Sequence, residues 1–207
     1  MRTARTTRTD GDRTRRRLID VAIAAFAADG FSAVSTRRLA GDADCNVATL
    51  NYHFGSKLGL YRAAVEAVYE RIAARAADVV PTLPGAAIGD IVERAWRIAR
   101  EERDGIRILL RQVLDEGRLE AESAAAHFLP SLEERAALAG HLLGVSPTHA
   151  RTALVTLGLL LGRAAVQDAE SLREAYGAAS VDAAERTVIH CLTLTAHALL
   201  EAPCDTP

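Results

Sequence analysis

The sequence predicts an all-α protein made of a small N-terminal domain and a larger helical body. Three observations lead to this fold class. The chain has 207 residues, which is enough for a small domain joined to a larger one. Ala and Leu are abundant and aromatic residues account for only 4%, a balance that favours helices over strands. Apolar residues recur at helical spacing, and the predicted helix ends carry capping residues.

The N-terminal part of the chain is basic and the rest is acidic. Residues 1–62 hold 11 Lys and Arg against 6 Asp and Glu, whereas residues 63–207 hold 14 against 21. Because surface charge steers association, a polyanion partner is expected for the N-terminal part only. Residues 1–12 (MRTARTTRTDGD) lack apolar periodicity and are predicted to form a flexible basic arm, either a contributor to polyanion binding or a plain disordered tail.

Residues 13–62 predict a compact set of helices. A first helix runs from about residue 13 to Gly30, a good residue for a helix end. Its apolar stripe is Leu18, Ala22, Ala25 and Phe26. Polar capping residues precede three further helices: Ser35 before 36–43, Asn46 before 47–53, and Ser56 before a longer helix from residue 57. The turn 43–45 joins the second helix to the third.

Residues 63–207 are predicted to form the helical body, with a break at 81–85 (PTLPG). The expected helices are 87–103, 106–118, 124–143, 147–166 and 182–201, with a loop and a short helical turn around 168–180. Ser146 followed by Pro147 is a strong start signal for the fourth of these. The whole chain is then expected to contain about nine helices.

Two short helices joined by a tight turn form the helix-turn-helix, which lays its second helix in the major groove of DNA. In the second helix, Leu50 is expected to face the core with Phe54 behind it. The residues left for DNA are Val47, Ala48, Thr49, Asn51, Tyr52 and His53. Ala and Thr can meet a thymine methyl and Asn can pair with adenine, whereas Thr49 and Tyr52 can equally serve phosphates.

A phosphate site is predicted where the fourth helix begins. Its free N–H groups, its dipole and Lys57, the only lysine of the chain, converge there. Arg37 and Arg38 near the start of the second helix are expected to add salt-sensitive affinity.

An ordered set of short motifs over residues 13–62 resembles the N-terminal domain of the TetR family. The motifs are GF at 30–31, STRRLA at 35–40, TLNYHFGSK at 49–57 and LY at 60–61. The resemblance implies an all-helical homodimer that binds a palindromic operator, with residues 49, 52, 53 and 57 facing the DNA. It also implies a divergent C-terminal domain with an effector pocket.

Two positions depart from the family pattern. Asp44 stands in the turn where many relatives have Gly, and Asp tolerates the left-handed backbone that such a turn needs. Asn51 stands where relatives often have Tyr, which changes the expected base preference. The Asn46-Val47-Ala48 start followed by Tyr52 is similar to a CecR-like branch of the family.

Two predicted body helices carry features of a helix–helix interface. Gly158 and Gly162 are four residues apart, which lets another helix approach closely, and the last helix is apolar over much of its circumference. The resemblance implies that both helices pair with their two-fold mates in a four-helix bundle. The candidate dimer residues are Gly158, Gly162, Leu192, Thr195 and Leu199. The alternative is that both helices belong to the intramolecular core.

The effector pocket is expected on the body helices. Candidate lining residues are Trp96, Arg107, Arg111, His127, Phe128 and Arg163, with Gln112 beside them. Each has a plainer interpretation, because a lone Trp is often core and the arginines at 94, 97, 100, 103, 107 and 111 can form a solvated face. One buried arginine would indicate an anionic effector.

Other kinds of chemistry are not expected. His190, Cys191 and His197 are wrongly spaced on a helix for a shared metal, and Cys45 in the turn is expected to be a small buried hydrophobe. Adjacent acidic pairs such as Glu101-Glu102 cannot act as an acid/base couple, so no catalytic residue and no cofactor is predicted. No stretch is long enough to span a bilayer, no apolar signal segment is present, and three unpatterned cysteines favour a reducing cytoplasm.

The sequence therefore predicts a DNA-binding transcriptional regulator, a repressor released from its operator by a small molecule. The alternative is a helical small-molecule-binding or scaffold protein with a vestigial DNA-binding domain, which the sparse basic charge beyond residue 62 supports.

Overall fold

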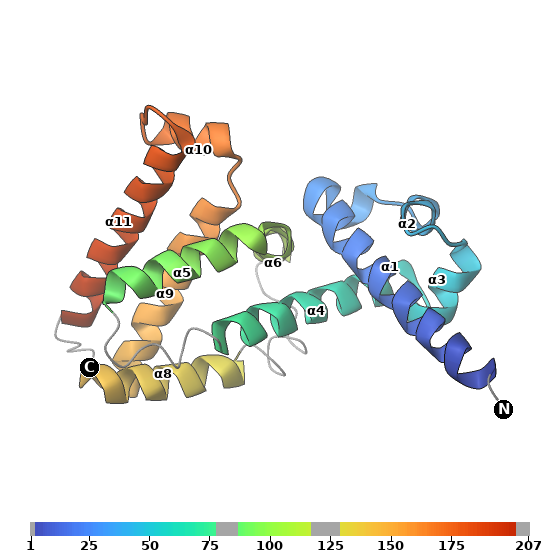
Figure 1. Ribbon diagram of the computed structural model, residues 1–207, viewed down its shortest axis with the longest axis horizontal. Coiled ribbons are helices and arrows are strands. Elements are labelled where there is room, and N and C mark those ends of the chain that lie inside the picture. The colour runs from blue at the N-terminus through green and yellow to red at the C-terminus, as the bar shows by residue number, and fades with distance from the viewer. Residues whose placement is uncertain (1–2, 78–86, 117–128, 202–207) are drawn as a thin grey trace.

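The computed structural model describes residues 3–77, 87–116 and 129–201, and over these ranges the chain forms ten α-helices and no strand. The helices are α1 (Thr3–Ala33), α2 (Thr36–Asp42), α3 (Val47–Phe54), α4 (Lys57–Ala77), α5 (Ile88–Glu101), α6 (Arg103–Glu116), α8 (Leu129–Leu143), α9 (Pro147–Ala165), α10 (Ala169–Ala175) and α11 (Val181–Glu201). Figure 1 shows α1 to α3 at one end of the molecule, with α4 leading from them to the body formed by the later helices. The predicted all-α fold is confirmed.

Capping residues begin the helices where the sequence placed them. The Ser35 hydroxyl accepts the Arg38 N–H at 3.2 Å and starts α2. The Ser146 hydroxyl accepts the His149 N–H at 3.1 Å, directly before Pro147 at the start of α9. Each cap satisfies one of the N–H groups that a helix start leaves without a partner. The predicted break at 81–85 and the expected helical residues 124–128 lie outside the described residues.

Two segments are more helical than the sequence suggested. The expected flexible arm is helical from Thr3, because α1 continues N-terminally without a proline to stop it. Extending an existing helix is far easier than nucleating one, and α1 is anchored by the buried residues that follow. The segment around 168–180 contains α10, which Asp168 caps by accepting the Ser171 N–H at 2.9 Å.

The core of the N-terminal domain also contains a residue from the body. Leu18 and Phe26 of α1, Leu39 of α2, Leu50 of α3 and Leu60 of α4 are at most 1% exposed and pack in one cluster. Ile108 of α6 belongs to the same cluster and is 1% exposed. The body is therefore packed into the N-terminal domain through α6.

A second core lies inside the body. It joins α5, α9, α10 and α11, and its buried residues are Trp96, Ala99, Ala165, Leu172, Ala184, Val188 and Leu192. Figure 1 shows α5 running across α9 with one end beside α11, and α5 packs against both of these helices. None of the described helices is long and apolar enough to cross a membrane.

Two arginines of the predicted solvated face instead cover the C-terminal end of α9. Arg100 donates to the carbonyls of Ala165 at 3.0 Å and Gln167 at 2.7 Å, and Arg107 donates to the carbonyl of Val166 at 2.7 Å. A helix end leaves its last carbonyls without partners and carries partial negative charge, so a cation is favoured there. The interpretation as a solvated face is wrong for these two residues.

Replacing Arg100 by Leu is expected to destabilise the protein by about 2–3 kcal/mol. The change removes two carbonyl partners and leaves Glu185, which lies 3.2 Å from the Arg100 guanidinium, without its cation. The measurement is the free energy of unfolding in urea. The matched control is Arg97→Leu on the exposed side of the same helix, where a change within about 0.5 kcal/mol is expected. Equal losses in both variants would contradict the capping role.

Candidate nucleic-acid interface

The turn between α2 and α3 has the backbone of a helix-turn-helix. Asp44 adopts the left-handed conformation with φ 55°, the only positive φ at a non-glycine position among the described residues. Its carboxylate lies 3.5 Å from the Arg17 guanidinium of α1. The Cys45 N–H donates to the Ala40 carbonyl at 2.9 Å and closes the turn. Asp44 therefore adopts the conformation that the sequence required and ties the turn to α1.

Cys45 packs against the core of the N-terminal domain, as its predicted role as a small hydrophobe requires. It is half-buried, and burial raises the pKa of its thiol above the ordinary value. A raised pKa keeps the sulfur protonated and poorly reactive at neutral pH.

Asn46 fixes the start of α3. Its Oδ1 accepts the Thr49 N–H at 2.8 Å and the Thr49 hydroxyl at 3.1 Å. Leu50 is fully buried and Phe54 is half-buried against the same core, as predicted. The two apolar residues, four positions apart on one face, orient the helix.

The opposite face of α3 is open to solvent. Tyr52 is 86% exposed, Ala48 and Asn51 are also exposed, and the His53 ring lies edge-on to the Tyr52 ring at 5.2 Å. Val47 and Thr49 are half-buried. The structure thus places the predicted DNA-contact residues of α3 on or beside the side of the helix that lies opposite Leu50.

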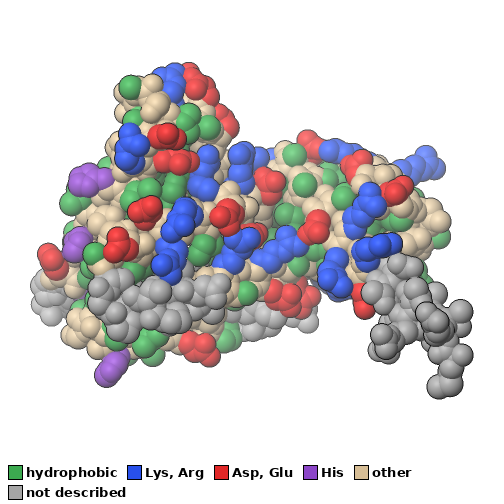
Figure 2. All heavy atoms as spheres, viewed as in Figure 1, with side chains coloured by type: hydrophobic (Ala, Val, Ile, Leu, Met, Phe, Trp, Pro, Cys, Tyr) green, Lys and Arg blue, Asp and Glu red, His purple; other side chains and the backbone are tan. Residues whose placement is uncertain are grey.

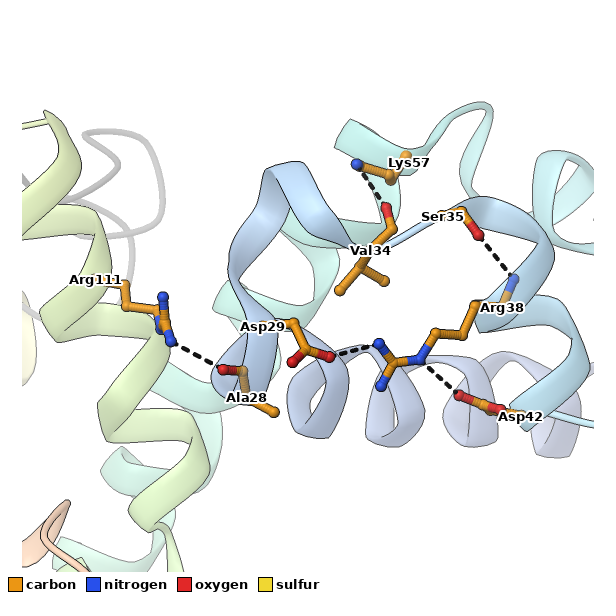
Figure 3. A network of polar contacts seen from close by, with 8 residues as sticks. All are labelled: Ala28, Asp29, Val34, Ser35, Arg38, Asp42, Lys57 and Arg111. Atoms are coloured by element: carbon orange, nitrogen blue, oxygen red, sulfur yellow. Dashed lines mark hydrogen bonds and ion pairs between the residues drawn. The ribbon is translucent and has the colours of Figure 1, made fainter.

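The Lys57 side chain is fixed by two contacts within the N-terminal domain. Its Nζ donates to the Val34 carbonyl at 2.7 Å and lies 4.3 Å from the centre of the Phe31 ring. Figure 3 shows this side chain reaching from the start of α4 to the connection between α1 and α2. An ammonium has three N–H groups, so this bond still leaves donors for a phosphate.

The two arginines of α2 have different environments. Arg38 donates to Asp29 at 2.5 Å and lies 3.5 Å from Asp42, and the hydrogen bond to Asp29 raises the pKa of its guanidinium. Figure 3 shows Arg38 lying between the two carboxylates. Arg37 is exposed, and no ion pair holds it among the described residues. Arg37 is therefore the arginine of α2 that is available to DNA.

Gly59 is a site residue that the sequence motifs did not identify. A Cβ at this position would lie 2.0 Å from the Phe54 carbonyl oxygen, so only glycine lets α4 pass the end of α3 so closely. The Gly59 N–H donates to the Ser56 hydroxyl at 3.1 Å, which confirms the predicted cap of α4. A glycine inside a helix is unfavourable by itself, and that cost is the signal that could have identified it.

The described residues do not gather the predicted pocket residues in one cavity. Trp96 is buried in the body core, Arg107 caps α9, and Arg163 is exposed. Arg111 reaches the N-terminal domain, where it donates to the carbonyls of residues 27 and 28. His127 and Phe128 lie outside the described residues.

The predicted dimer residues divide between the interior and the surface. Leu192 is 6% exposed within the body core, and Gly162 is buried against Ile106, where a Cβ would lie 3.4 Å from that side chain. Within the chain, Ile106 of α6 covers Gly162 and the body core covers Leu192, which is the intramolecular packing that the sequence left as the alternative. Gly158 is exposed, and Thr195 and Leu199 are half-buried. Large exposed apolar residues lie on the same two helices: Val155, Leu159 and Leu160 on α9, and Leu194 on α11.

Positive side chains are not confined to the N-terminal domain. Figure 2 shows Lys and Arg side chains over this domain and also over the middle of the molecule, with Asp and Glu side chains interspersed. Several of the arginines form ion pairs that join two helices, as Arg71 of α4 does with Asp20 of α1. Ion pairs of this kind occupy some of the positive side chains of the molecule, so these side chains are not free for another partner.

Comparison with known proteins supports the sequence resemblance. Residues 18–64 match the family model of the bacterial regulatory proteins of the tetR family. A protein of Mesorhizobium loti assigned to the TetR-family transcriptional regulators has a similar structure, with a TM-score of 0.68 at 16% identity over 92% of this chain and 96% of that one. A TetR-like transcriptional regulator from Rhodococcus sp. RHA1 gives 0.56 at 21% identity over 89% and 96%.

The multidrug binding protein EbrR, complexed with imidazole, gives a TM-score of 0.53 at 23% identity over 92% of this chain and 97% of that one. At these identities the solved structures show a shared fold. Among curated proteins, no sequence matches the chain significantly. The similarity to a CecR-like branch stays a prediction.

Replacing Gly59 by Ala is expected to destabilise the N-terminal domain by about 2–3 kcal/mol, because the new methyl group collides with a backbone oxygen that cannot move alone. Urea denaturation measures the loss. Gly41→Ala in α2 is the control, since a Cβ there meets nothing within 4 Å and Ala is the better helix former, so stability is expected to rise by up to about 1 kcal/mol. A neutral Gly59→Ala would show that the α3–α4 corner is not tightly constrained.

Proposed function

We propose that this chain, whose N-terminal domain and overall fold are those of the TetR family, is a sequence-specific transcriptional regulator. It acts as a homodimer on a palindromic operator, and a small-molecule effector releases it. The observation that carries the proposal is the exposed face of α3, where Tyr52 is 86% exposed and Asn51 projects beside it, on a helix oriented by the buried Leu50.

The proposed contacts divide between base reading and phosphate binding. Asn51, Ala48 and Thr49 lie on a helix that can enter the major groove, where amides and methyl groups discriminate between bases. Lys57 and Arg37 are assigned to phosphates, which set the position of the domain on the duplex without reading sequence. Tyr52 and His53 complete the contact surface.

We assign residues 13–62 to DNA binding and residues 63–207 to effector binding and dimerisation, with residues 1–12 as a basic extension. α4 belongs to both parts, because its start lies beside α3 and it leads into the body. An effector bound in the body then alters the spacing of the two α3 helices by moving α4. This requires that the effector binds the two arrangements with different affinity.

Among the predicted effector residues, Trp96 keeps the strongest support. Its indole is 2% exposed, and its Nε1 has no hydrogen-bond partner among the described residues. A buried N–H without a partner is unfavourable, and a ligand acceptor would satisfy it. EbrR, which shares the fold, is a multidrug binding protein complexed with imidazole, and this supports a small organic effector for the present chain.

The proposed dimer surface is the exposed apolar part of α9 and α11. Leu159 is 63% exposed, Leu194 is 56% exposed, and Leu160 is 46% exposed. Apolar side chains of this size exposed on two packed helices are typical of an interface. Burying them against a two-fold copy would place four helices in one bundle.

The test of the function is selection of operators from random DNA duplexes, followed by affinity measurements at several salt concentrations. A palindromic consensus is expected, with half-sites about one helical turn, or a multiple of it, apart. Failure to enrich any sequence would overturn the proposal and favour a helical ligand-binding or scaffold protein with a vestigial DNA-binding domain.

Replacing Lys57 by Ala is expected to weaken binding to all duplexes by a similar factor and to flatten the salt dependence by about one unit. The measurement is fluorescence anisotropy of labelled duplexes from low to high salt. Arg71→Ala is the matched control, because it removes one positive charge from the same helix at a residue that pairs with Asp20. If both variants lose affinity equally, Lys57 does not bind a phosphate.

Replacing Leu159 by Glu is expected to weaken dimerisation at least about tenfold, because a carboxylate buried in an apolar interface costs more than about 1.4 kcal/mol. Sedimentation velocity over a range of concentrations measures the change. The control is Leu114→Glu, where the leucine is 82% exposed and belongs to α6, a helix outside the proposed surface. A variant at residue 159 that dimerises like the parent would place the interface elsewhere.

A further inference from the structure

A small pocket lies where the body meets the N-terminal domain. It has a volume of about 110 Å³. Its lining residues are Phe26 and Phe31 of α1, Leu58 and Tyr61 of α4, and Ile108, Arg111 and Gln112 of α6. We call it the joint pocket. It lies apart from the body core of α5, α9 and α11, none of whose residues line it.

Three aromatic rings form one wall of the joint pocket. The ring centres of Phe26 and Tyr61 are 5.2 Å apart, those of Phe31 and Tyr61 are 5.1 Å apart, and both pairs meet edge to face. Such packing holds the rings in fixed orientations. Leu58 is 46% exposed and Phe31 is 36% exposed, so the apolar wall reaches the surface. The wall favours a flat apolar molecule.

Gln112 is a buried polar residue in the lining of the joint pocket. Its side chain is 2% exposed, and its Oε1 has no hydrogen-bond partner among the described residues. Buried amide oxygens in folded proteins nearly always accept a hydrogen bond, so an unsatisfied one at a pocket marks a place for a donor. A ligand with an N–H or O–H group would supply that donor.

Arg111 ties the two domains together beside the joint pocket. Its Nε donates to the Ala27 carbonyl at 3.2 Å, and its Nη2 donates to the Ala28 carbonyl at 3.0 Å, near the end of α1. Figure 3 shows the side chain extending from α6 to this end of α1. Gly30, with φ 80°, lets the guanidinium approach, because a Cβ there would lie 3.2 Å from Nη1. A molecule in the pocket therefore touches both sides of this connection.

We propose that the joint pocket is a ligand site for a single-ring aromatic molecule that carries one hydrogen-bond donor, such as a phenol. Its volume is smaller than the apolar cavity of about 150 Å³ that binds benzene in a protein interior, so a single ring occupies it with one edge projecting past Leu58 and Phe31 at the surface. The ring packs against the aromatic wall and the donor satisfies Gln112 Oε1. Because the occupant contacts α1, α4 and α6 together, its binding changes the affinity of the protein for DNA. This last part rests on the proposed function, whereas the binding itself does not.

The binding test is calorimetric titration of the full chain with phenol and with toluene, which has a similar shape but no donor. One phenol is expected per chain, bound at least tenfold more tightly than toluene. Gln112→Leu is expected to remove this preference, and because it replaces an unsatisfied buried amide it should leave the fold intact. Absence of saturable phenol binding to the parent would overturn the proposal.

Two further variants locate the site. Leu58→Trp extends a half-exposed side chain over the pocket and is expected to reduce phenol affinity at least tenfold. Trp96→Phe alters the body core and is expected to leave phenol affinity unchanged. The reverse result, with binding lost in Trp96→Phe and kept in Leu58→Trp, would place phenol in the body and overturn the assignment.

The regulatory part is tested by the affinity for a selected operator duplex with and without saturating phenol. A change of at least threefold is expected for the parent and none for Gln112→Leu. A chain that binds phenol with the expected preference but binds no DNA contradicts the proposed function and leaves the site standing. If the chain binds phenol and the operator but saturating phenol leaves the operator affinity unchanged, the proposed coupling between the two sites is overturned.

Discussion

The contact between α6 and α1 is the constraint on which the arrangement of the two domains depends. Ile108 is buried in the core of the N-terminal domain although it belongs to a body helix, and Arg111 next to it binds the last carbonyls of α1 before its kink at Gly30. The buried Ile108 side chain and the hydrogen bonds of Arg111 therefore hold the same end of α1. A shift of α6 must either carry α1 with it or break both interactions, so α6 couples the position of the body to that of the N-terminal domain.

The exposed face of α3 depends on contacts made behind it. Leu50 anchors the helix, the Asn46 cap fixes its first turn, and Gly59 permits α4 to pass close to its end. A helix of this length has little stability of its own, so its orientation is set by the surrounding packing. The residues on this open face can therefore vary in identity, as Asn51 does relative to the TetR-family pattern, without loss of the packing that holds the helix.

Local signals in the sequence were sufficient for most of the fold. Ser35, Asn46 and Ser146 each start a helix where expected, because a cap is an interaction between residues three positions apart. Long-range partners carry no such signal. The bonds of Arg100 and Arg107 to the end of α9 join residues about sixty positions apart, and the inward packing of Gly162 and Leu192 depends on which helix covers them. Periodicity shows that a face is apolar without showing what covers it.

Not every cation of residues 1–62 is free for a phosphate. Arg38 is held by Asp29 and Asp42, and Arg17 is held by Asp44, so these arginines and carboxylates neutralise each other within the domain. The proposed phosphate contacts then fall to Lys57, Arg37, the basic extension and the exposed arginines that follow it on α1, Arg15 and Arg16 among them. Each arginine held in such a pair removes one salt-sensitive contact from the proposed complex, so a larger share of the operator affinity is expected from the open face of α3.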